Sequence, residues 1–315
     1  MKRESMVARV EAYLRARRAL GYELRITGAE LLRFARFADA AGHRGAVTAD
    51  LAMRWARHAT AATRQYQARR LDDVRCFAKY QLALEPDTEI PPTGVLGPPR
   101  RRRQPYIFEA SEISALVSAA NRLPPTRGIR GSTYATLLGV LACTGMRISE
   151  ALQLKRADAD LEAGVLSIRK TKFKKSRLIP VHRSALDELR RYVAKRDATV
   201  PDLAGATLLV CRAGRPLPYS TVRTVFRKLI DQIVPQHVST HRRPRIHDLR
   251  HTFACRAVLR WYRDGVDVDQ RIAALSTYLG HAKVSDTYWY LTGVPELMAI
   301  AAARFERFGC EGSSP

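Results

Sequence analysis

Acidic residues are scarce in this chain, and that shortage is the first feature to explain. Asp and Glu total 30, against 54 Lys and Arg, which gives a formal net charge of +24 over 315 residues and a pI of about 10.5. A surplus of this size repels itself in a compact fold unless a polyanion or solvent screens it. Nucleic acid is the expected partner, because each neutralised phosphate releases counterions and adds affinity. An anionic membrane surface is the alternative source of negative charge.

Long apolar runs and paired cysteines are also missing. No stretch approaches the roughly 18 apolar residues of a membrane span, and the N-terminal MKRESMVARVEAYLRARR is too charged for a signal peptide. The five cysteines form no Cys-x-x-Cys pair, which argues against a disulfide framework and against a structural zinc site. We therefore expect a cytoplasmic, nucleoid-associated protein without a membrane partner. The cysteines are Cys76, Cys143, Cys211, Cys255 and Cys310.

The N-terminal part of the chain has the periodicity of helices. Apolar residues recur at helical spacing in four segments, and arginines occupy the polar face of each one. Thr48 is a plausible N-cap of the third segment. Arginine-rich faces are either solvated or directed at a polyanion, and the preference for Arg over Glu on every helix favours DNA. The predicted helices are Val7–Leu20, Ala29–Ala41, Thr48–His58 and Thr63–Leu84.

A change of composition marks a boundary between two domains. Residues 86–105 contain six prolines, two glycines and the run Arg100–Arg103, which cannot continue a helix and suit an extended linker. The arginine run either follows a phosphate backbone or is a solvated tether. We predict a helical domain at 1–86, a linker at 87–105, a second domain at 106–306 and a tail at 307–315.

The second domain is predicted to be mainly helical with one small sheet. Ser111 is the expected cap of its first helix, and the strongly apolar Thr133–Cys143 forms the next. Residues 164–181 contain two β-rich runs around a basic turn, which is typical of a hairpin. The fold class is therefore mainly α (α+β), without internal repeats. Further helices are expected from near Ile148 and at 184–197, 220–233, 247–263, 268–278 and 295–306.

Two segments contain basic residues suited to a phosphate. Arg147 follows the turn Thr144–Gly145 at the start of a helix, where its planar fork can grip a phosphate; the structural alternative is a pair with Glu150. The hairpin turn is dense in cations, which either track phosphates or deliver one lysine as a proton donor. Its basic residues are Lys170, Lys172, Lys174, Lys175 and Arg177.

Two further segments contain histidines or tyrosines at suggestive spacings. His247 and Arg250 are three residues apart on one helix face. His247 and His251 have the spacing of a zinc-binding helix, but Asp248 stands where a metalloprotease needs Glu, so a pair of phosphate donors is favoured. His281 follows Leu279–Gly280, and Tyr288 and Tyr290 flank a tryptophan in what is by itself an ordinary aromatic cluster.

Together, in this order and at this spacing, these blocks resemble the tyrosine recombinases of the phage integrase family. The resemblance covers about residues 105–305 and matches the motifs Thr-Gly-Met-Arg-Ile-Ser-Glu, the hairpin ending in Arg-Leu-Ile-Pro-Val, His-x-x-Arg-His, Leu-Gly-His and a tyrosine nine residues later. It implies an N-terminal core-binding domain that clamps DNA and a C-terminal catalytic domain. It also implies the catalytic set Arg147, Lys172, His247, Arg250, His281 and the nucleophile Tyr290, with Lys170 as the rival lysine and Tyr288 as the rival tyrosine.

The implied reaction is cleavage and rejoining of double-stranded DNA through a 3′-phosphotyrosyl intermediate in a synapse of four protomers, with related recombinases as further possible partners. Cations around the phenol, whose ordinary pKa is about 10, would favour its nucleophilic form. No metal or other cofactor is expected, and Glu150 and Asp248 are expected to orient basic residues. The absence of an N-terminal arm domain favours a simple or transposon-borne recombinase. A type IB topoisomerase-like enzyme and a DNA-binding protein without cleavage activity are the alternatives.

Overall fold

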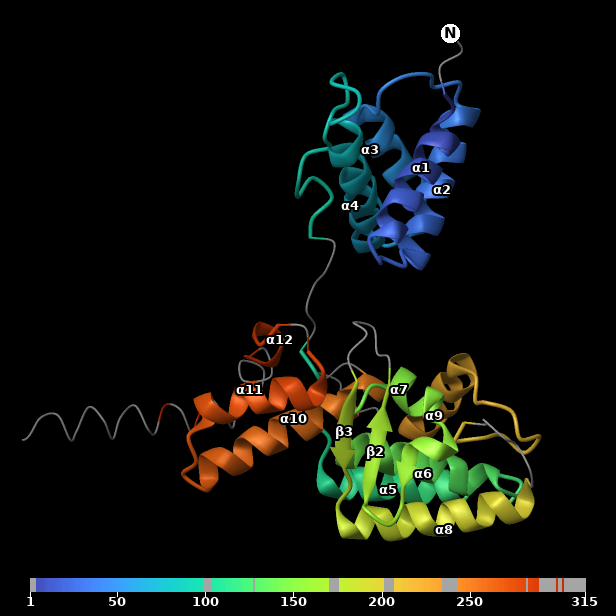
Figure 1. Ribbon diagram of the computed structural model, residues 1–315, viewed down its shortest axis with the longest axis vertical. Helices are drawn as coiled ribbons and strands as arrows, with labels where there is room; N and C mark the ends of the chain where they lie inside the picture. Colours follow the sequence, from blue (N-terminus) through green and yellow to red (C-terminus); the bar gives the residue numbers. More distant parts are fainter. Residues whose placement is uncertain are drawn as a thin grey trace, which may run out of the picture. The chain divides into compact units, whose positions relative to one another are not determined.

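The computed structural model describes residues 4–98, 104–126, 128–169, 176–200, 207–233, 243–281 and 283–288, together with Ala299 and Ala302. The chain divides into two compact units, Met1–Arg103 and Gln104–Pro315, which are taken separately below (Figure 1). The roles of these units as DNA clamp and catalytic domain stay predictions.

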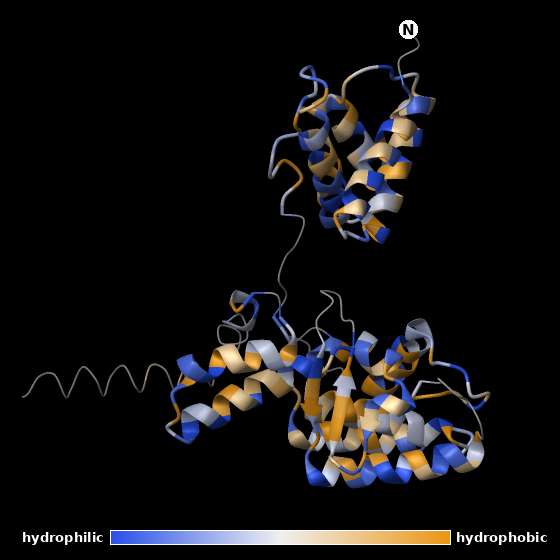
Figure 2. Ribbon diagram, in the orientation of Figure 1, coloured by the Kyte–Doolittle hydropathy of each residue, from blue (hydrophilic) through white to orange (hydrophobic). Residues whose placement is uncertain are grey.

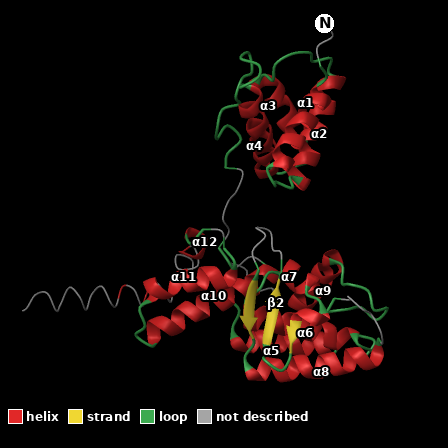
Figure 3. Cartoon of the chain, in the orientation of Figure 1, coloured by secondary structure: helices red, strands yellow, loops and turns green. Residues whose placement is uncertain are grey.

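Unit 1 is a bundle of helices, as the apolar periodicity predicts (Figure 3). Three of them begin at a hydroxyl cap that accepts a backbone N–H: Ser5 from Ala8, Thr48 from Leu51 and Thr63 from Tyr66. The predicted cap at Thr48 is thus confirmed. The helices are α1 (Met6–Ala19), α2 (Arg25–Ala40), α3 (Ala49–His58) and α4 (Arg64–Gln81).

Helix α2 begins four residues before the predicted start at Ala29, at Arg25. Thr27 and Gly28 have poor helix propensity, but both make tertiary contacts. A Cβ on Gly28 would lie 3.3 Å from a methyl carbon of Leu14, and the Thr27 hydroxyl bonds to Asp73 at 3.1 Å. Packing against α1 and α4 therefore outweighs local propensity in this turn.

The core of unit 1 is aromatic and encloses one arginine. Phe34 and Phe77 are fully buried, and Phe34 meets Trp55 edge to face at 6.2 Å. Arg70 is 5% exposed, lies 3.5 Å from the ring centre of Trp55 and forms an ion pair with Glu30 at 3.8 Å. A cation held by an aromatic face and a carboxylate can be buried in this way.

The first part of the predicted linker is held against unit 1. The Glu89 N–H donates to Val47 at 2.8 Å, and Arg75 donates to the carbonyls of Pro91 and Pro92. Leu96 joins the apolar core at 7% exposure. The segment forms no helix and turns at Gly94–Gly97, where the Gly97 N–H donates to the Gly94 carbonyl at 2.8 Å. Its hydrogen bonds and burial make it part of the unit.

Unit 2 combines helices with one antiparallel sheet of order β1-β2-β3. The register pairs Val165 with Pro180 and Ile168 with Arg177. The predicted fold class is confirmed, and the two β runs of the predicted hairpin are β2 and β3. The elements are α5 (Ala110–Asn121), α6 (Arg130–Thr144), α7 (Ile148–Gln153), η1 (Arg156–Asp158), β1 (Ala159–Asp160), β2 (Val165–Ile168), β3 (Arg177–Pro180), α8 (Arg183–Thr199), α9 (Tyr219–Ile233), α10 (Ile246–Arg263), α11 (Val268–Leu279) and α12 (Ser285–Tyr288).

The predicted cap at Ser111 is wrong, because helix α5 begins earlier. Glu109 is the N-cap, and its N–H donates to Glu112 at 2.7 Å, so that a carboxylate closes the first turn. Strand β1 was not predicted, since two residues are too few to show a periodicity. Of the helix predicted at 295–306, only Ala299 and Ala302 belong to the part of the chain that the structure describes.

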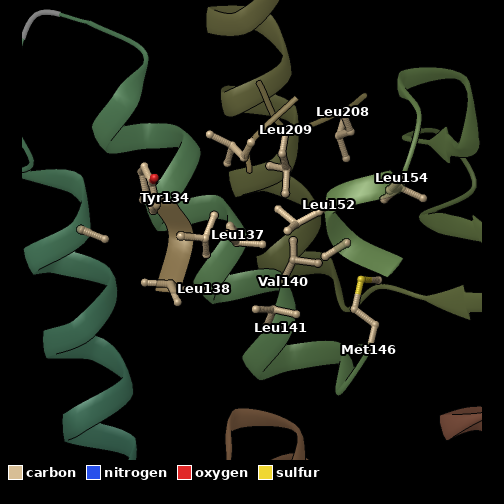
Figure 4. Packing of buried hydrophobic residues seen from close by; sticks show 14 of the residues in the cluster. Tyr134, Leu137, Leu138, Val140, Leu141, Met146, Leu152, Leu154, Leu208 and Leu209 are labelled. Atoms are coloured by element: carbon tan, nitrogen blue, oxygen red, sulfur yellow. The ribbon is translucent and has the colours of Figure 1, made fainter. Parts of the chain in front are cut away.

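Helix α6 lies at the centre of the unit 2 core. Leu137, Val140 and Leu141 of α6 pack with Leu152 of α7 and with Leu208 (Figure 4). Figure 2 shows hydrophobic and hydrophilic residues interleaved along the helices around this core, as expected for helices with one buried face. None of the described helices is long and apolar enough to cross a membrane.

Candidate active site

Arg147 occupies a tight turn between two helices. Helix α6 ends at Thr144, Gly145 adopts φ +61°, and Arg147 is the N-cap of α7. The Arg147 N–H donates to Glu150 Oε2 at 2.8 Å, which closes the first turn of α7. A Cβ on Gly145 would lie 2.9 Å from Cγ of Phe253 on α10. Both the left-handed backbone and the close phenyl ring of Phe253 therefore require glycine at position 145.

Arg250 is buried in α10, at 2% exposure, and reaches the two turns that flank the site. Its Nη1 donates to the carbonyl of Gly145 at 2.8 Å, and its Nη2 donates to the carbonyl of Leu279 at 2.6 Å. Carbonyl acceptors satisfy these N–H groups without cancelling the charge. Arg250 thus joins the ends of α6 and α11 and places a positive charge between them.

The end of α11 receives Arg147 as well. Gly280 is the C-cap at φ +67°, and its carbonyl accepts from Arg147 Nη2 at 2.5 Å. A Cβ on Gly280 would lie 3.2 Å from Arg147 Nη1 and 2.9 Å from Arg177 Nη1. The two guanidinium groups therefore pack on a position where only glycine fits. Cations at a helix C-terminus are also favoured by the helix dipole.

His281 follows this turn and is held at two points. Its N–H donates to the Ser276 carbonyl at 2.9 Å, and its Nδ1 hydrogen-bonds to the buried Thr287 hydroxyl at 2.7 Å. Burial, together with the charges of Arg250 and Arg147, lowers the pKa of His281 to about 4. The imidazole is therefore neutral at neutral pH, and Thr287 fixes its orientation.

His247 lies in the first turn of α10, one turn before His251. Although His247 is exposed, the protein atoms crowded around its ring and then Arg250, Arg245 and Arg147 lower its pKa to about 4. The rings of His247 and His251 meet at 4.7 Å and 88°. Burial and then His247 lower the pKa of His251 to about 3. A neutral His247 can accept a proton.

Glu150 connects two arginines through one carboxylate. It is 8% exposed, and it accepts from Arg147 Nη1 at 2.9 Å and from Arg177 at 3.1 and 2.7 Å. Burial alone would raise the pKa of Glu150, but the hydrogen bonds from Arg177 and Arg147 outweigh it and lower the pKa. The expectation that Glu150 orients basic residues agrees with these contacts, and Asp248 holds Arg245 in the same way.

Four predicted site residues thus come together from three separate parts of the sequence: Arg147, His247, Arg250 and His281. Lys172, its rival Lys170 and Tyr290 lie outside the described residues. Tyr288 ends α12 and is 44% exposed.

The sequence motifs do not predict the contacts that Arg177 and Thr287 make. The charge pattern predicts Arg177 only as one cation of the hairpin, yet it shares a strand face with buried Ile179. This alternation is a signal that it points inward. Thr287 gives no comparable signal.

The described part of the chain contains no group of three His, Cys, Asp or Glu side chains that could hold a metal ion.

Comparison with known proteins places this site in a family. The pattern of the Phage integrase family matches residues 107–294. The y4rB protein of Sinorhizobium fredii (strain NBRC 101917 / NGR234), named as an integrase/recombinase, is 41% identical over 302 residues, which is 95% of this chain and 96% of the relative. The chain belongs to the phage integrase family.

Other relatives agree with this membership. Tyrosine recombinase XerD of Staphylococcus saprophyticus is 25% identical over 234 residues, or 74% of this chain and 73% of that protein. A structure of the Tn1549 transposon integrase with a circular intermediate DNA has a TM-score of 0.69 at 17% identity, covering 96% of this chain and 99% of the other. A structure of XerH recombinase bound to its difH substrate has a TM-score of 0.64 at 18% identity, covering 89% and 79%.

These comparisons confirm two sequence predictions. The predicted family, the tyrosine recombinases, is confirmed. The predicted enzyme class, a tyrosine-type DNA strand transferase, is confirmed with it. The role of each site residue in this phage integrase family member stays a prediction.

Proposed function

We propose that this enzyme cuts and rejoins double-stranded DNA at specific sites through a 3′-phosphotyrosyl intermediate on Tyr290. The observation that carries the proposal is the convergence of Arg147, Arg250 and His281 at the C-terminal end of α11. Two guanidinium groups and a neutral imidazole supply hydrogen-bond donors and positive charge at one point, which suits a phosphodiester.

In the proposed cleavage step, phosphorus exchanges one ester bond for another. The Tyr290 oxygen attacks, the bond from phosphorus to the tyrosine oxygen forms, and the bond to the 5′ oxygen breaks. His247 accepts the tyrosine proton, and Lys172 donates a proton to the departing 5′ oxygen. Arg147, Arg250 and His281 stabilise the charge that grows on the non-bridging oxygens. Because the phosphotyrosyl ester conserves the backbone bond, rejoining needs no external energy source.

The protonation states support these roles. The pKa of about 4 at His247 leaves its imidazole neutral, so it can act as a base at neutral pH. An incoming phosphate carries negative charge, which raises the pKa of a nearby histidine and favours the imidazolium that proton transfer creates. Desolvation of the ring, and then the surrounding arginines, thus keep His247 unprotonated before DNA binds, and the DNA phosphate favours its protonation afterwards.

We further propose that the enzyme works as a homo-oligomer on DNA, tetrameric at the synapse, in the cytoplasm and at the nucleoid. Its formal net charge of +24 supports a polyanionic partner. Unit 1, with the linker segment that packs on it, is proposed as the DNA clamp, and unit 2 as the catalytic domain. Transposition is one setting for such an exchange.

Covalent capture tests this function without a known target sequence. The enzyme is mixed with a pool of nicked duplexes of randomised sequence, in which cleavage releases a short fragment and prevents rejoining. We expect a complex that resists detergent, whose DNA is blocked at the 3′ end. Binding without such a complex would instead identify a DNA-binding protein. The recovered sequence is then placed on two duplexes: exchanged strands support recombination, whereas plasmid relaxation by a monomer without exchange supports a topoisomerase-like enzyme.

A further inference from the structure

Arg177 is a largely buried arginine to which the proposed mechanism gives no role. It begins β3, on the face that also carries the fully buried Ile179. Its side chain is 11% exposed and crosses from the sheet to the first turn of α7. There Nη1 donates to Glu150 Oε1 at 3.1 Å and Nη2 donates to Oε2 at 2.7 Å. This is the two-pronged pairing for which a guanidinium is suited.

The shared carboxylate determines how much charge Arg147 keeps. Glu150 Oε1 also accepts from Arg147 Nη1, and Oε2 accepts from the Arg147 N–H. One negative charge thus lies between two guanidinium groups, which leaves one net positive charge. Since Arg177 takes both oxygens, the carboxylate is neutralised mainly from the β3 side.

Arg177 also contacts the turn that Arg147 binds. A Cβ on Gly280 would lie 2.9 Å from Arg177 Nη1, so this guanidinium packs against the backbone of Gly280, whose carbonyl accepts from Arg147. Among the described residues, the charged groups that face Glu150 are Arg147, the N-cap of α7, and Arg177 from β3. Arg177 therefore links three elements of the site: the sheet, the start of α7 and the end of α11.

We propose that Arg177 is a positioning residue that holds and neutralises the Glu150 carboxylate, so that Arg147 keeps its orientation and its charge for the scissile phosphate. The inference rests on the proposed function and deepens it. Without Arg177, Arg147 is the remaining charged partner of the buried carboxylate among the residues that the structure describes. The carboxylate would then pull that guanidinium toward α7 and compete with the phosphate for it.

The test compares charge variants on a duplex recovered by covalent capture. Arg177→Gln should lower the rate of adduct formation at saturating DNA by about tenfold to a hundredfold, because a small misplacement of a group at a reacting centre has effects of this size. The dissociation constant for the duplex should change by less than about threefold, since the Arg177 side chain is only 11% exposed and is paired with Glu150. Thermal unfolding of each variant confirms that folded protein is compared.

Two further variants separate charge from shape. In Arg177→Gln/Glu150→Gln the competing carboxylate is gone, so we expect adduct formation to recover by at least about fivefold over Arg177→Gln. Arg177→Lys retains the charge and should fall between the wild type and Arg177→Gln. The matched control is the exposed pair on α8: Arg191→Gln, alone or with Glu188→Gln, should leave the rate unchanged.

The outcomes are distinct. Absence of a wild-type adduct would reject the proposed function itself. A wild-type adduct with an unchanged rate in folded Arg177→Gln would overturn the role of Arg177. The role is also overturned if the rate of adduct formation in Arg177→Gln/Glu150→Gln does not exceed the rate in Arg177→Gln. A purely structural contact of Arg177 would not depend on the negative charge of Glu150.

Discussion

Gly145→Ala should destabilise unit 2 by an amount that its surroundings allow us to work out. Gly145 has φ +61°, a conformation that costs a residue with a Cβ about 1 to 2 kcal/mol. The new methyl group would also lie 2.9 Å from Cγ of Phe253, and an overlap of this kind in a packed interior costs about 1 to 3 kcal/mol. We therefore expect the free energy of unfolding to fall by about 2 to 5 kcal/mol.

Helix α6 offers a matched control in Gly139. A Cβ there meets nothing within 4 Å beyond the helix backbone itself, so Gly139→Ala should stabilise the unit by about 0.5 to 1 kcal/mol through the lost entropy of glycine. Both variants are measured in the full chain by amide hydrogen exchange of peptides from α6 and α10, as a function of urea concentration. A loss below about 1 kcal/mol for Gly145→Ala would refute the close packing of this turn.

Two further predictions concern proton transfer and protonation. Lys172→Ala should slow cleavage when the leaving group is a 5′ oxygen but not when it is a 5′ thiol, which needs no proton donor; the same pattern in Lys170→Ala would show that the other lysine is the acid. The protein should also become less stable as the pH is lowered, because the pKa of His251 in the folded chain, about 3, lies below the ordinary value of 6.5. The unfolded chain therefore binds a proton that the folded chain excludes, so this contribution is complete above pH 6.5 and is lost as the pH falls toward 3. At a pH of about 5 the wild type should lose about 2 kcal/mol more than His251→Phe, relative to neutral pH. Equal losses in the two proteins would show that His251 is not excluded from protonation.

Much of the fold follows from the periodicity of the sequence. The helices with a clear apolar stripe, such as α3 and α9, lie within a residue of their predicted limits, because hydrophobic burial and hydroxyl caps are local signals. The start of α2 at Arg25 was missed because a tertiary contact at Gly28 decides it. The cap of α5 was missed because Glu109 and Glu112 act as a pair, which a search for Ser or Thr overlooks.

The candidate active site also depends on tertiary contacts that local sequence signals do not predict. Motifs could name Arg147, Arg250 and His281, but the contact that unites the two arginines is with the backbone carbonyls of Leu279 and Gly280. Every residue has a backbone carbonyl, so the residue type does not predict which carbonyls the two arginines bind. The same holds for the bridge between Arg177 and Glu150, which joins residues 27 positions apart and depends on the hairpin register.

The nucleophile is the central claim, and the protein–DNA linkage tests it most directly. The captured complex is digested with protease and nuclease, and mass spectrometry locates the peptide residue that carries the nucleotide. The account predicts a nucleotide on Tyr290, with Tyr290→Phe still binding the duplex but forming no adduct, and with Tyr288→Phe forming it normally. A nucleotide on Tyr288, or an adduct that persists in Tyr290→Phe, would contradict it.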